Sequence, residues 1–165
     1  MKQAARILVV DDERAVRMML ETALRAQGYR VQSSATGREA RELLRGEEFD
    51  LVLLDLQLGD SDGTDILREI KNTWPATEVI LLTAHGSINS AIAALRLGAF
   101  DYLLKPAQVQ DIRERVERGL EQRQVTLQRG ELLQRISESA RALGIIEGGG
   151  GVPPMQPTNS DRIEV

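Results

Sequence analysis

The chain has 165 residues, a formal net charge of −4, no cysteine and a single histidine. This length suits one well-buried domain with an appendage better than two full domains. The lack of cysteine excludes disulfides and thiolate metal sites, and one histidine disfavours a histidine-ligated zinc site, so any metal should be bound by oxygen.

The charge balance and the apolar runs exclude further classes of protein. A chain with a net negative charge has no overall basic character that would favour binding to nucleic acid. No apolar run is long enough to span a bilayer, and residues 1–6 lack the pattern of a signal peptide. We therefore expect a cytoplasmic protein without a membrane segment.

Five predicted strands alternate with stretches of helical spacing. In chain order the strands cover residues 7–10, 29–35, 51–54, 79–82 and 100–104. The first, third and fourth are continuous apolar runs closed by a polar residue, which is typical of buried parallel strands. The second and fifth mix polar and apolar residues, as expected at the edges of a sheet.

Four helices are predicted between these strands, from apolar stripes within residues 16–24, 40–44, 66–70 and 88–95. Three glycines supply stop signals for helices, at Gly28, Gly46 and Gly98. Because strand–helix–strand crossovers are right-handed, this alternation predicts an α/β fold. It is a doubly wound, five-stranded parallel sheet with helices on both faces.

A fifth helix is predicted from near Gln108, and it has no strong stop signal where a compact domain would end. Its first apolar stripe comprises Val109, Ile112, Val116 and Leu120, and a later seam comprises Leu133, Ile136, Ala140 and Leu143. We therefore divide the chain into a domain at 1–122, a helical extension at 123–146 that could form a coiled coil, and a flexible linker or tail at 147–165.

The later seam has three possible fates, because an isolated segment of this length is only marginally helical in water. It folds back on the domain, pairs with a second chain or stays partly disordered. Pairing is our preferred interpretation, although Gly119 and Gly130 favour a bend or a break. At the end of the tail, residues 161–165 are either the first strand of a further domain or a frayed end.

Polar residues follow the strands at the centre of the predicted sheet. Asp11 and Asp12 follow the first strand and Asp55 the third, while Thr83 and Lys105 follow the fourth and fifth. With strand order 2-1-3-4-5, the carboxyl ends of all five strands meet at one edge, and the first and third strands flank the topological switch point. The five side chains should therefore converge.

Three converging carboxylates repel one another unless a cation neutralises them. Mg²⁺ prefers oxygen ligands, tolerates one or two protein carboxylates and accepts phosphate oxygens. The pattern therefore predicts a magnesium site for phosphoryl chemistry. Taken singly, Asp11 and Asp12 could instead be turn or helix-capping residues, but together with Asp55 this interpretation falls away.

Five motifs connect these residues along the chain. They are LVVDDE at 8–13, LLDL at 53–56, DG at 62–63, TA at 83–84 and GAFDYLLKP at 98–106. Together they resemble the receiver domains of two-component response regulators, over Arg6 to about Leu120. The resemblance implies the flavodoxin-like fold with strand order 2-1-3-4-5.

The resemblance also implies a role for each acidic residue. Asp55 would be the phosphoacceptor that attacks the phosphohistidine of a sensor histidine kinase or phosphotransfer protein. Asp12 would bind Mg²⁺ directly and Asp11 largely through water, with the backbone carbonyl of Gln57 completing the protein ligands. Mn²⁺ could substitute for Mg²⁺.

Other residues receive roles from the same resemblance. Thr83 would donate its hydroxyl to a phosphoryl oxygen, and Lys105 would be the cationic partner of the phosphoryl group, aimed by a cis bond to the following proline. Tyr102 resembles the switch aromatic, although half-buried packing is the alternative. Gln57 and His85 would set the lifetime of the phosphoryl group, although an exposed loop residue is the plainer interpretation of His85.

The expected protein is thus a switch rather than an enzyme. Phosphorylation would change the face made by the fourth helix, fifth strand and fifth helix, and this face commonly mediates dimers in the family. A homodimer is therefore expected. The output, transcription or another, would lie in a missing or partner domain that the sequence does not identify.

The sequence departs from the family pattern in the loop after Asp55. Gly59 stands where proline is common in the family, and Ser61 stands where an apolar residue is common. Asp60 adds an acid that could alter metal affinity or kinase choice, although an exposed loop aspartate is the simpler interpretation. We therefore expect a looser loop.

Two other functions also place chemistry at strand ends. A phosphohydrolase usually carries its nucleophile on the first strand with a second aspartate two residues on, whereas here Gln57 stands two residues after Asp55. A dinucleotide-binding module needs a glycine-rich turn after the first strand. Here the turn is acidic and would repel pyrophosphate.

Overall fold

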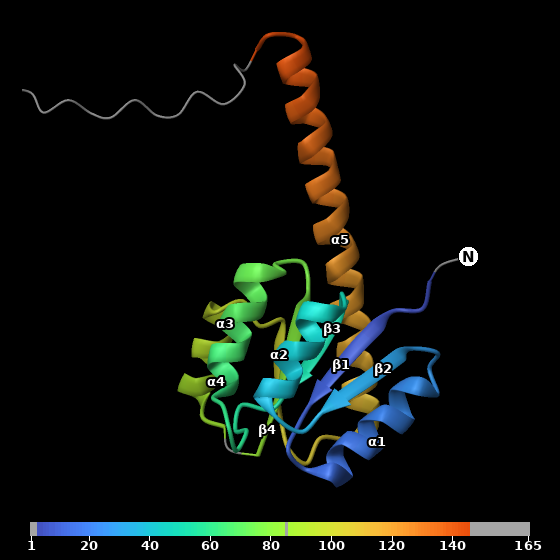
Figure 1. Ribbon diagram of the computed structural model, residues 1–165, viewed down its shortest axis with the longest axis vertical. Coiled ribbons are helices and arrows are strands. Elements are labelled where there is room, and N and C mark those ends of the chain that lie inside the picture. The colour runs from blue at the N-terminus through green and yellow to red at the C-terminus, as the bar shows by residue number, and fades with distance from the viewer. Residues whose placement is uncertain (1–2, 85, 146–165) are drawn as a thin grey trace, which may run out of the picture. The chain divides into compact units, whose positions relative to one another are not determined.

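The computed structural model describes residues 3–84 and 86–145, and its centre is one parallel sheet. The strands are β1 (Arg6–Val10), β2 (Arg30–Ser34), β3 (Leu51–Leu54), β4 (Glu78–Thr83) and β5 (Asp101–Leu104). Their order is β2-β1-β3-β4-β5, and every neighbouring pair is parallel (Figure 1). The predicted order and the predicted edge strands are confirmed, with strand ends shifted by one residue or none.

Helices cover both faces of the sheet. They are α1 (Arg14–Arg25), α2 (Gly37–Gly46), α3 (Gly63–Thr73), α4 (Ile88–Arg96) and α5 (Val109–Ala142). One apolar cluster joins α1 and α5 to the sheet, and a second joins α2, α3 and α4 to its other side. The doubly wound α/β fold is therefore confirmed.

The central strands β1, β3 and β4 are largely apolar because both of their faces are covered. In β1, Ile7 and Val9 pack in the cluster with α1 and α5, whereas Leu8 and Val10 pack in the cluster with α2 and α3. Alternate residues of a strand point to opposite faces, so a buried central strand needs an apolar side chain at every position.

Two of the three predicted helix stops use the conformational freedom of glycine. Gly28 has φ +89° and Gly98 has φ +100°, a region that residues with a Cβ rarely adopt. Gly46 is the last residue of α2 and does not need this conformation.

The last helix continues through both of its glycines. α5 runs from Val109 to Ala142, so the break that Gly119 or Gly130 could have caused does not occur. Gly119 has a packing reason to be glycine, because a Cβ there would lie 2.7 Å from Leu51 Cδ1.

Contacts divide the chain into two units, with the boundary between Gln128 and Arg129, and α5 contributes to both. The predicted tail at 147–165 lies outside the described residues. Within the described ranges, no helix is both long and apolar enough to cross a membrane.

Candidate functional site

The acidic turn after β1 forms one wall of the candidate site. Asp11 is buried and its Oδ1 accepts a hydrogen bond from the backbone N–H of Glu13 at 2.9 Å, while Asp12 is exposed beside it. Glu13 is the N-cap residue of α1 and makes no side-chain capping bond. Neither aspartate is therefore the N-cap residue of α1, whereas the bond from Glu13 N–H to Asp11 Oδ1 fits the turn alternative.

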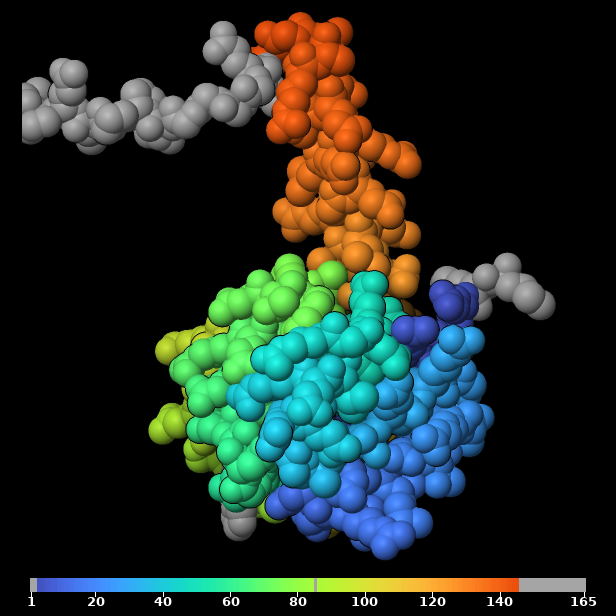
Figure 2. Space-filling view, in the orientation of Figure 1, coloured from blue at the N-terminus to red at the C-terminus, as the bar shows by residue number. Residues whose placement is uncertain are grey.

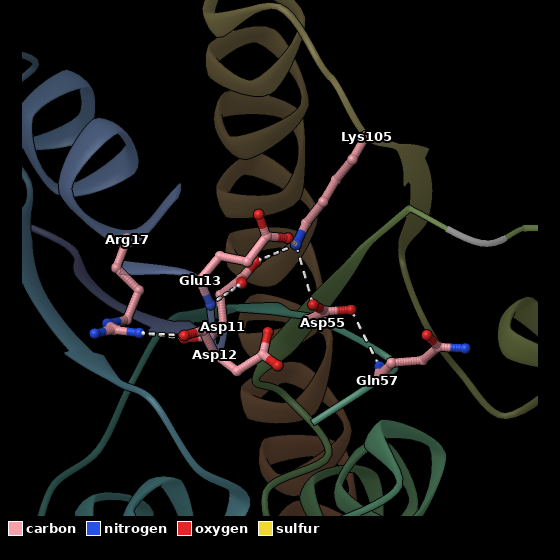
Figure 3. A network of polar contacts seen from close by, with 7 residues as sticks. All are labelled: Asp11, Asp12, Glu13, Arg17, Asp55, Gln57 and Lys105. Carbon is pink, nitrogen blue, oxygen red and sulfur yellow. Dashed lines mark hydrogen bonds and ion pairs between the residues drawn. The ribbon is translucent and has the colours of Figure 1, made fainter. Parts of the chain in front are cut away.

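Arg17 holds the backbone of this turn. Its Nη1 donates to the carbonyl oxygens of Asp11 at 2.8 Å and of Asp12 at 3.1 Å. In Figure 3 the guanidinium reaches the turn from the side away from Lys105. Arg17 thus fixes the peptide groups of the turn and leaves the carboxylates directed toward the site.

Lys105 crosses the site from the end of β5. Its Nζ lies 2.6 Å from Asp11 Oδ2, 3.0 Å from Asp55 Oδ2 and 3.0 Å from Glu13 Oε1 (Figure 3). The side chain is only 10% exposed. The peptide bond to Pro106 is cis, as predicted.

Burial and ion pairing set the protonation of these groups. Burial raises the pKa of Asp11 above its ordinary value, although Lys105 and the Glu13 amide oppose the shift. Burial also disfavours the charge on Lys105, but its contacts with Asp11, Glu13 and Asp55 outweigh it and raise the pKa of Lys105. Lys105 is therefore a permanent cation among the carboxylates.

Asp55 lies at the floor of the site, directly after β3, and is 5% exposed. Its backbone N–H donates to Val10 O at 2.9 Å, which links it to the end of β1. Its Oδ1 accepts from the backbone N–H of Gln57 at 3.1 Å, and its Oδ2 faces Lys105. Both carboxylate oxygens are thus oriented by separate donors.

An open cleft of about 310 Å³ lies above Asp55, and its lining includes Asp12, Glu13, Gln57 and Thr83. Thr83 is the buried last residue of β4, and its carbonyl accepts from the Lys105 backbone N–H at 2.8 Å. All five side chains expected to converge do so, because the four parallel strands that position them, β1, β3, β4 and β5, end at one edge of the sheet.

The carboxylates fit a divalent cation. Asp11, Asp12, Glu13 and Asp55 each offer one oxygen, and these oxygens lie within 4.8 Å of one another. A cluster of four carboxyl groups that offers only oxygen ligands suits a hard ion such as Mg²⁺. Gln57 lines the same cleft.

Of the two remaining predicted residues, Tyr102 and His85, the structure describes only Tyr102. Tyr102 is half-buried, and its hydroxyl has no hydrogen-bond partner among the described residues. Burial raises the pKa of Tyr102, and a Cβ at Gly86 would collide with its hydroxyl. His85 lies outside the described residues.

Two residues of the site were not singled out from the sequence. Glu13 contacts Lys105, and its signal was its place in the acidic run DDE at 11–13. Arg17 had no comparable signal, because a surface arginine on a helix is common and its carbonyl partners are visible only in three dimensions.

Comparisons with known proteins agree with this geometry. The family model described as the response regulator receiver domain matches residues 7–117. The chain is 34% identical over 143 residues to the alginate biosynthesis transcriptional regulatory protein AlgB of Pseudomonas aeruginosa, which covers 87% of this chain and 31% of that protein. The chain spans about a third or less of the curated relatives that it matches.

Two solved structures are also similar. One is a CheY-like receiver domain protein from Methanospirillum hungatei JF-1, with TM-score 0.72 and 30% identity over 75% of this chain and 99% of that one. The other is the beryllofluoride-activated NtrC4 receiver domain dimer, with TM-score 0.69 and 33% identity over 72% of this chain and 98% of that one.

Proposed function

The chain belongs to the family of response regulator receiver domains, and from this premise we propose that Asp55 accepts a phosphoryl group from a histidine kinase or phosphotransfer protein. The N–P bond of the donor's phosphohistidine breaks and an O–P bond to Asp55 forms. The leaving imidazole keeps the electron pair of the broken bond and takes up a proton.

The position of Asp55 carries this proposal. It is the acidic side chain at the floor of the cleft, and its two oxygens face different donors, Gln57 N–H and Lys105 Nζ. The carboxylate is therefore held in one orientation, as in-line attack requires.

Asp11, Asp12 and the Gln57 carbonyl would hold Mg²⁺ together with Asp55. When bound, the ion supplies positive charge that neutralises the carboxylates and the oxygens of the phosphoryl group in transfer. Lys105, an ammonium, would add further positive charge, and the Thr83 hydroxyl would donate to a phosphoryl oxygen.

The direct test is labelling by acetyl phosphate with Mg²⁺, followed by intact-mass analysis. We expect one phosphoryl group per chain in the wild type and none in Asp55→Asn. Asp65→Asn is the matched control, because Asp65 is an exposed aspartate on α3 that pairs with Arg68 outside the site. Labelling that survives Asp55→Asn would exclude the assignment.

We propose that the chemistry serves a switch and not the turnover of a separate substrate. Asp55 would form and lose one acyl phosphate, and Gln57 and His85 would set its lifetime. Steady release of phosphate from a phosphomonoester, abolished by Asp55→Asn, would instead indicate a phosphohydrolase.

We propose that the response is read at α4, β5 and α5. Phosphorylation would draw Thr83 toward the phosphoryl group, and Tyr102, on the neighbouring strand, would change rotamer in response. The unpaired hydroxyl of Tyr102 supports this, because no hydrogen bond to another described residue would have to break.

We also propose that the chain forms a homodimer through the second unit. Large apolar side chains of this unit are exposed, namely Leu132, Leu133 and Ile136 on α5 and Leu143 just after it. Interleaved arginines and glutamates could pair across two copies of the helix. The NtrC4 receiver structure is described as a dimer, which favours a second copy as the partner.

Sedimentation velocity should show a dimer at tens of micromolar with beryllofluoride and Mg²⁺. Leu133→Glu together with Ile136→Glu should return it to a monomer, because charges would replace apolar contacts. Arg129→Glu is a control for charge alone. A wild type that stays monomeric under these conditions would contradict the proposal.

The proposal for the regulatory output rests on the relatives of the chain. AlgB is described as a transcriptional regulatory protein, and we propose that this chain likewise controls transcription, through a domain that the described residues do not contain. A transcription profile of cells carrying Asp55→Asn in the natural gene would test this, and an unchanged profile would count against it.

A further inference from the structure

The loop between β3 and α3 forms a small closed unit beside the site. Leu56 O accepts from Gly63 N at 2.8 Å, and Gln57 and Asp62 form an isolated antiparallel bridge. Residues 58–61 form the tip. One arm of the loop carries Gln57, whose N–H bonds Asp55 Oδ1.

Asp60, at the tip, binds the start of a different helix. Its Oδ1 accepts from the backbone N–H of Gly37 at 2.8 Å and its Oδ2 from that of Arg38 at 3.0 Å. These are the first two amides of α2, which have no partner within the helix. The third, that of Glu39, donates to Thr36 Oγ1 at 3.1 Å.

A second contact places the loop tip against α2. A Cβ at Gly37 would lie 2.5 Å from Ser61 Oγ and 2.6 Å from Ser61 Cβ, so only glycine allows this approach. Arg41 Nη1 also donates to Ser61 Oγ at 3.2 Å. In Figure 2 the residues of α2 and the segment leading into α3 lie side by side.

The tip has no comparable restraint from Gly59. A Cβ at this position would meet nothing within 4 Å, and φ of Gly59 lies outside the left-handed region. A glycine there adds backbone freedom. The looser loop expected from the sequence stays a prediction, and in this structure Asp60 and Ser61 bond the loop tip to α2.

The carboxylate of Asp60 is charged at neutral pH. The Gly37 and Arg38 amides lower the pKa of Asp60, and the positive end of the α2 dipole acts in the same direction. Asp60 is thus an ionic anchor with two hydrogen bonds.

We propose that Asp60 is a positioning residue for the phosphoacceptor site. It fixes the loop tip on α2 so that the Gln57 backbone keeps its place beside Asp55. This inference rests on the proposed function, because it assigns the Gln57 carbonyl to the Mg²⁺ site. Asp60 itself touches neither the metal nor the phosphoryl group.

Loss of the Asp60 anchor should weaken Mg²⁺ binding more than it slows phosphoryl transfer at saturating Mg²⁺. A loop that is freed from α2 samples positions in which the Gln57 carbonyl is displaced. Because Mg²⁺ binds only the fraction of molecules in which this carbonyl is in place, its apparent affinity falls. We expect Asp60→Ala to raise the Mg²⁺ dissociation constant about tenfold, as loss of an outer support typically does. The labelling rate at saturating Mg²⁺ should stay near that of the wild type.

The experiment measures Mg²⁺ affinity by calorimetry, the Mg²⁺ dependence of acetyl phosphate labelling, and hydrogen exchange of the Gly37 and Arg38 amides. Asp60→Asn keeps one acceptor oxygen and should fall between Asp60→Ala and the wild type. If Asp60→Ala does not fold, Asp60→Asn alone still tests the proposal. Both amides should exchange faster in the variants.

Thr36→Ala is the matched control, since it removes the other cap of α2 without touching the loop. It should lower stability and leave Mg²⁺ affinity unchanged. If Thr36→Ala and Asp60→Ala weaken Mg²⁺ binding equally, Asp60 only stabilises a helix and the inference is wrong. Unchanged affinity in Asp60→Ala would also overturn it.

These outcomes are distinct from failure of the proposed function. A wild type that binds Mg²⁺ but is not labelled on Asp55 would contradict the phosphoacceptor assignment, whatever Asp60 does. A wild type that is labelled normally, with Asp60 variants that behave like Asp65→Asn, would contradict only the positioning role.

Discussion

At the residue scale, two aspartates in neighbouring loops behave differently because their surroundings differ. Asp11 is buried, and burial raises its pKa. Asp60 is exposed, and two backbone amides lower its pKa. The raised pKa of Asp11 favours a site in which a cation neutralises the carboxylate. The lowered pKa of Asp60 keeps its carboxylate ionised, as a permanent anchor requires.

The lowered pKa of Asp60 predicts a dependence of stability on pH. Because the folded-state value lies below the ordinary 3.8, the contribution of the anchor is present above that value and is lost as the pH falls through the folded-state pKa. The free energy of unfolding of the wild type should therefore exceed that of Asp60→Asn at neutral pH. The difference should shrink at acid pH. Urea unfolding of both proteins across this range measures it, and a constant difference would contradict the pKa shift.

At the scale of elements, α5 is fixed to the sheet by a buried charge as well as by apolar packing. Arg123 is one helical turn beyond Gly119, and its side chain is 5% exposed. Its Nε donates to Asp50 Oδ1 at 2.7 Å and its Nη2 to Glu48 Oε1 at 3.0 Å. Asp50 in turn accepts from the Arg6 backbone N–H, so this contact joins α5 to the starts of β1 and β3.

Arg123→Ala should destabilise the protein by about 2 kcal/mol, because it leaves Asp50 without its cation. The partial exposure of Asp50 keeps this loss below that of a fully buried ion pair. Chemical denaturation measures the change. Arg118→Ala, at an exposed position of the same helix, should have little effect. Equal effects of the two substitutions would show that Arg123 acts only through helix propensity.

At the scale of the whole molecule, the carboxylate cluster couples metal binding to folding. Four acidic groups assemble only when β1 and β3 are paired, so Mg²⁺ should bind the folded chain in preference to the unfolded one. At Mg²⁺ about a hundred times its dissociation constant, we expect the melting temperature to rise by roughly 8 °C.

Thermal unfolding with and without Mg²⁺ tests this coupling. Asp12→Asn should lose most of the shift and raise the stability of the metal-free protein, because it removes one of the repelling charges. Asp65→Asn should behave like the wild type. A wild-type melting temperature that does not respond to millimolar Mg²⁺ would contradict the site.

The sequence by itself determined the sheet and the convergence of Asp11, Asp55, Thr83 and Lys105, because buried parallel strands are apolar runs and their polar closing residues must meet at one edge. Only the tertiary structure decided what Arg17, Asp60 and Arg123 do. Their partners are backbone carbonyls, amides of another helix and carboxylates far along the chain. Contacts of this kind have no periodicity in the sequence, since they depend on where separate elements come together.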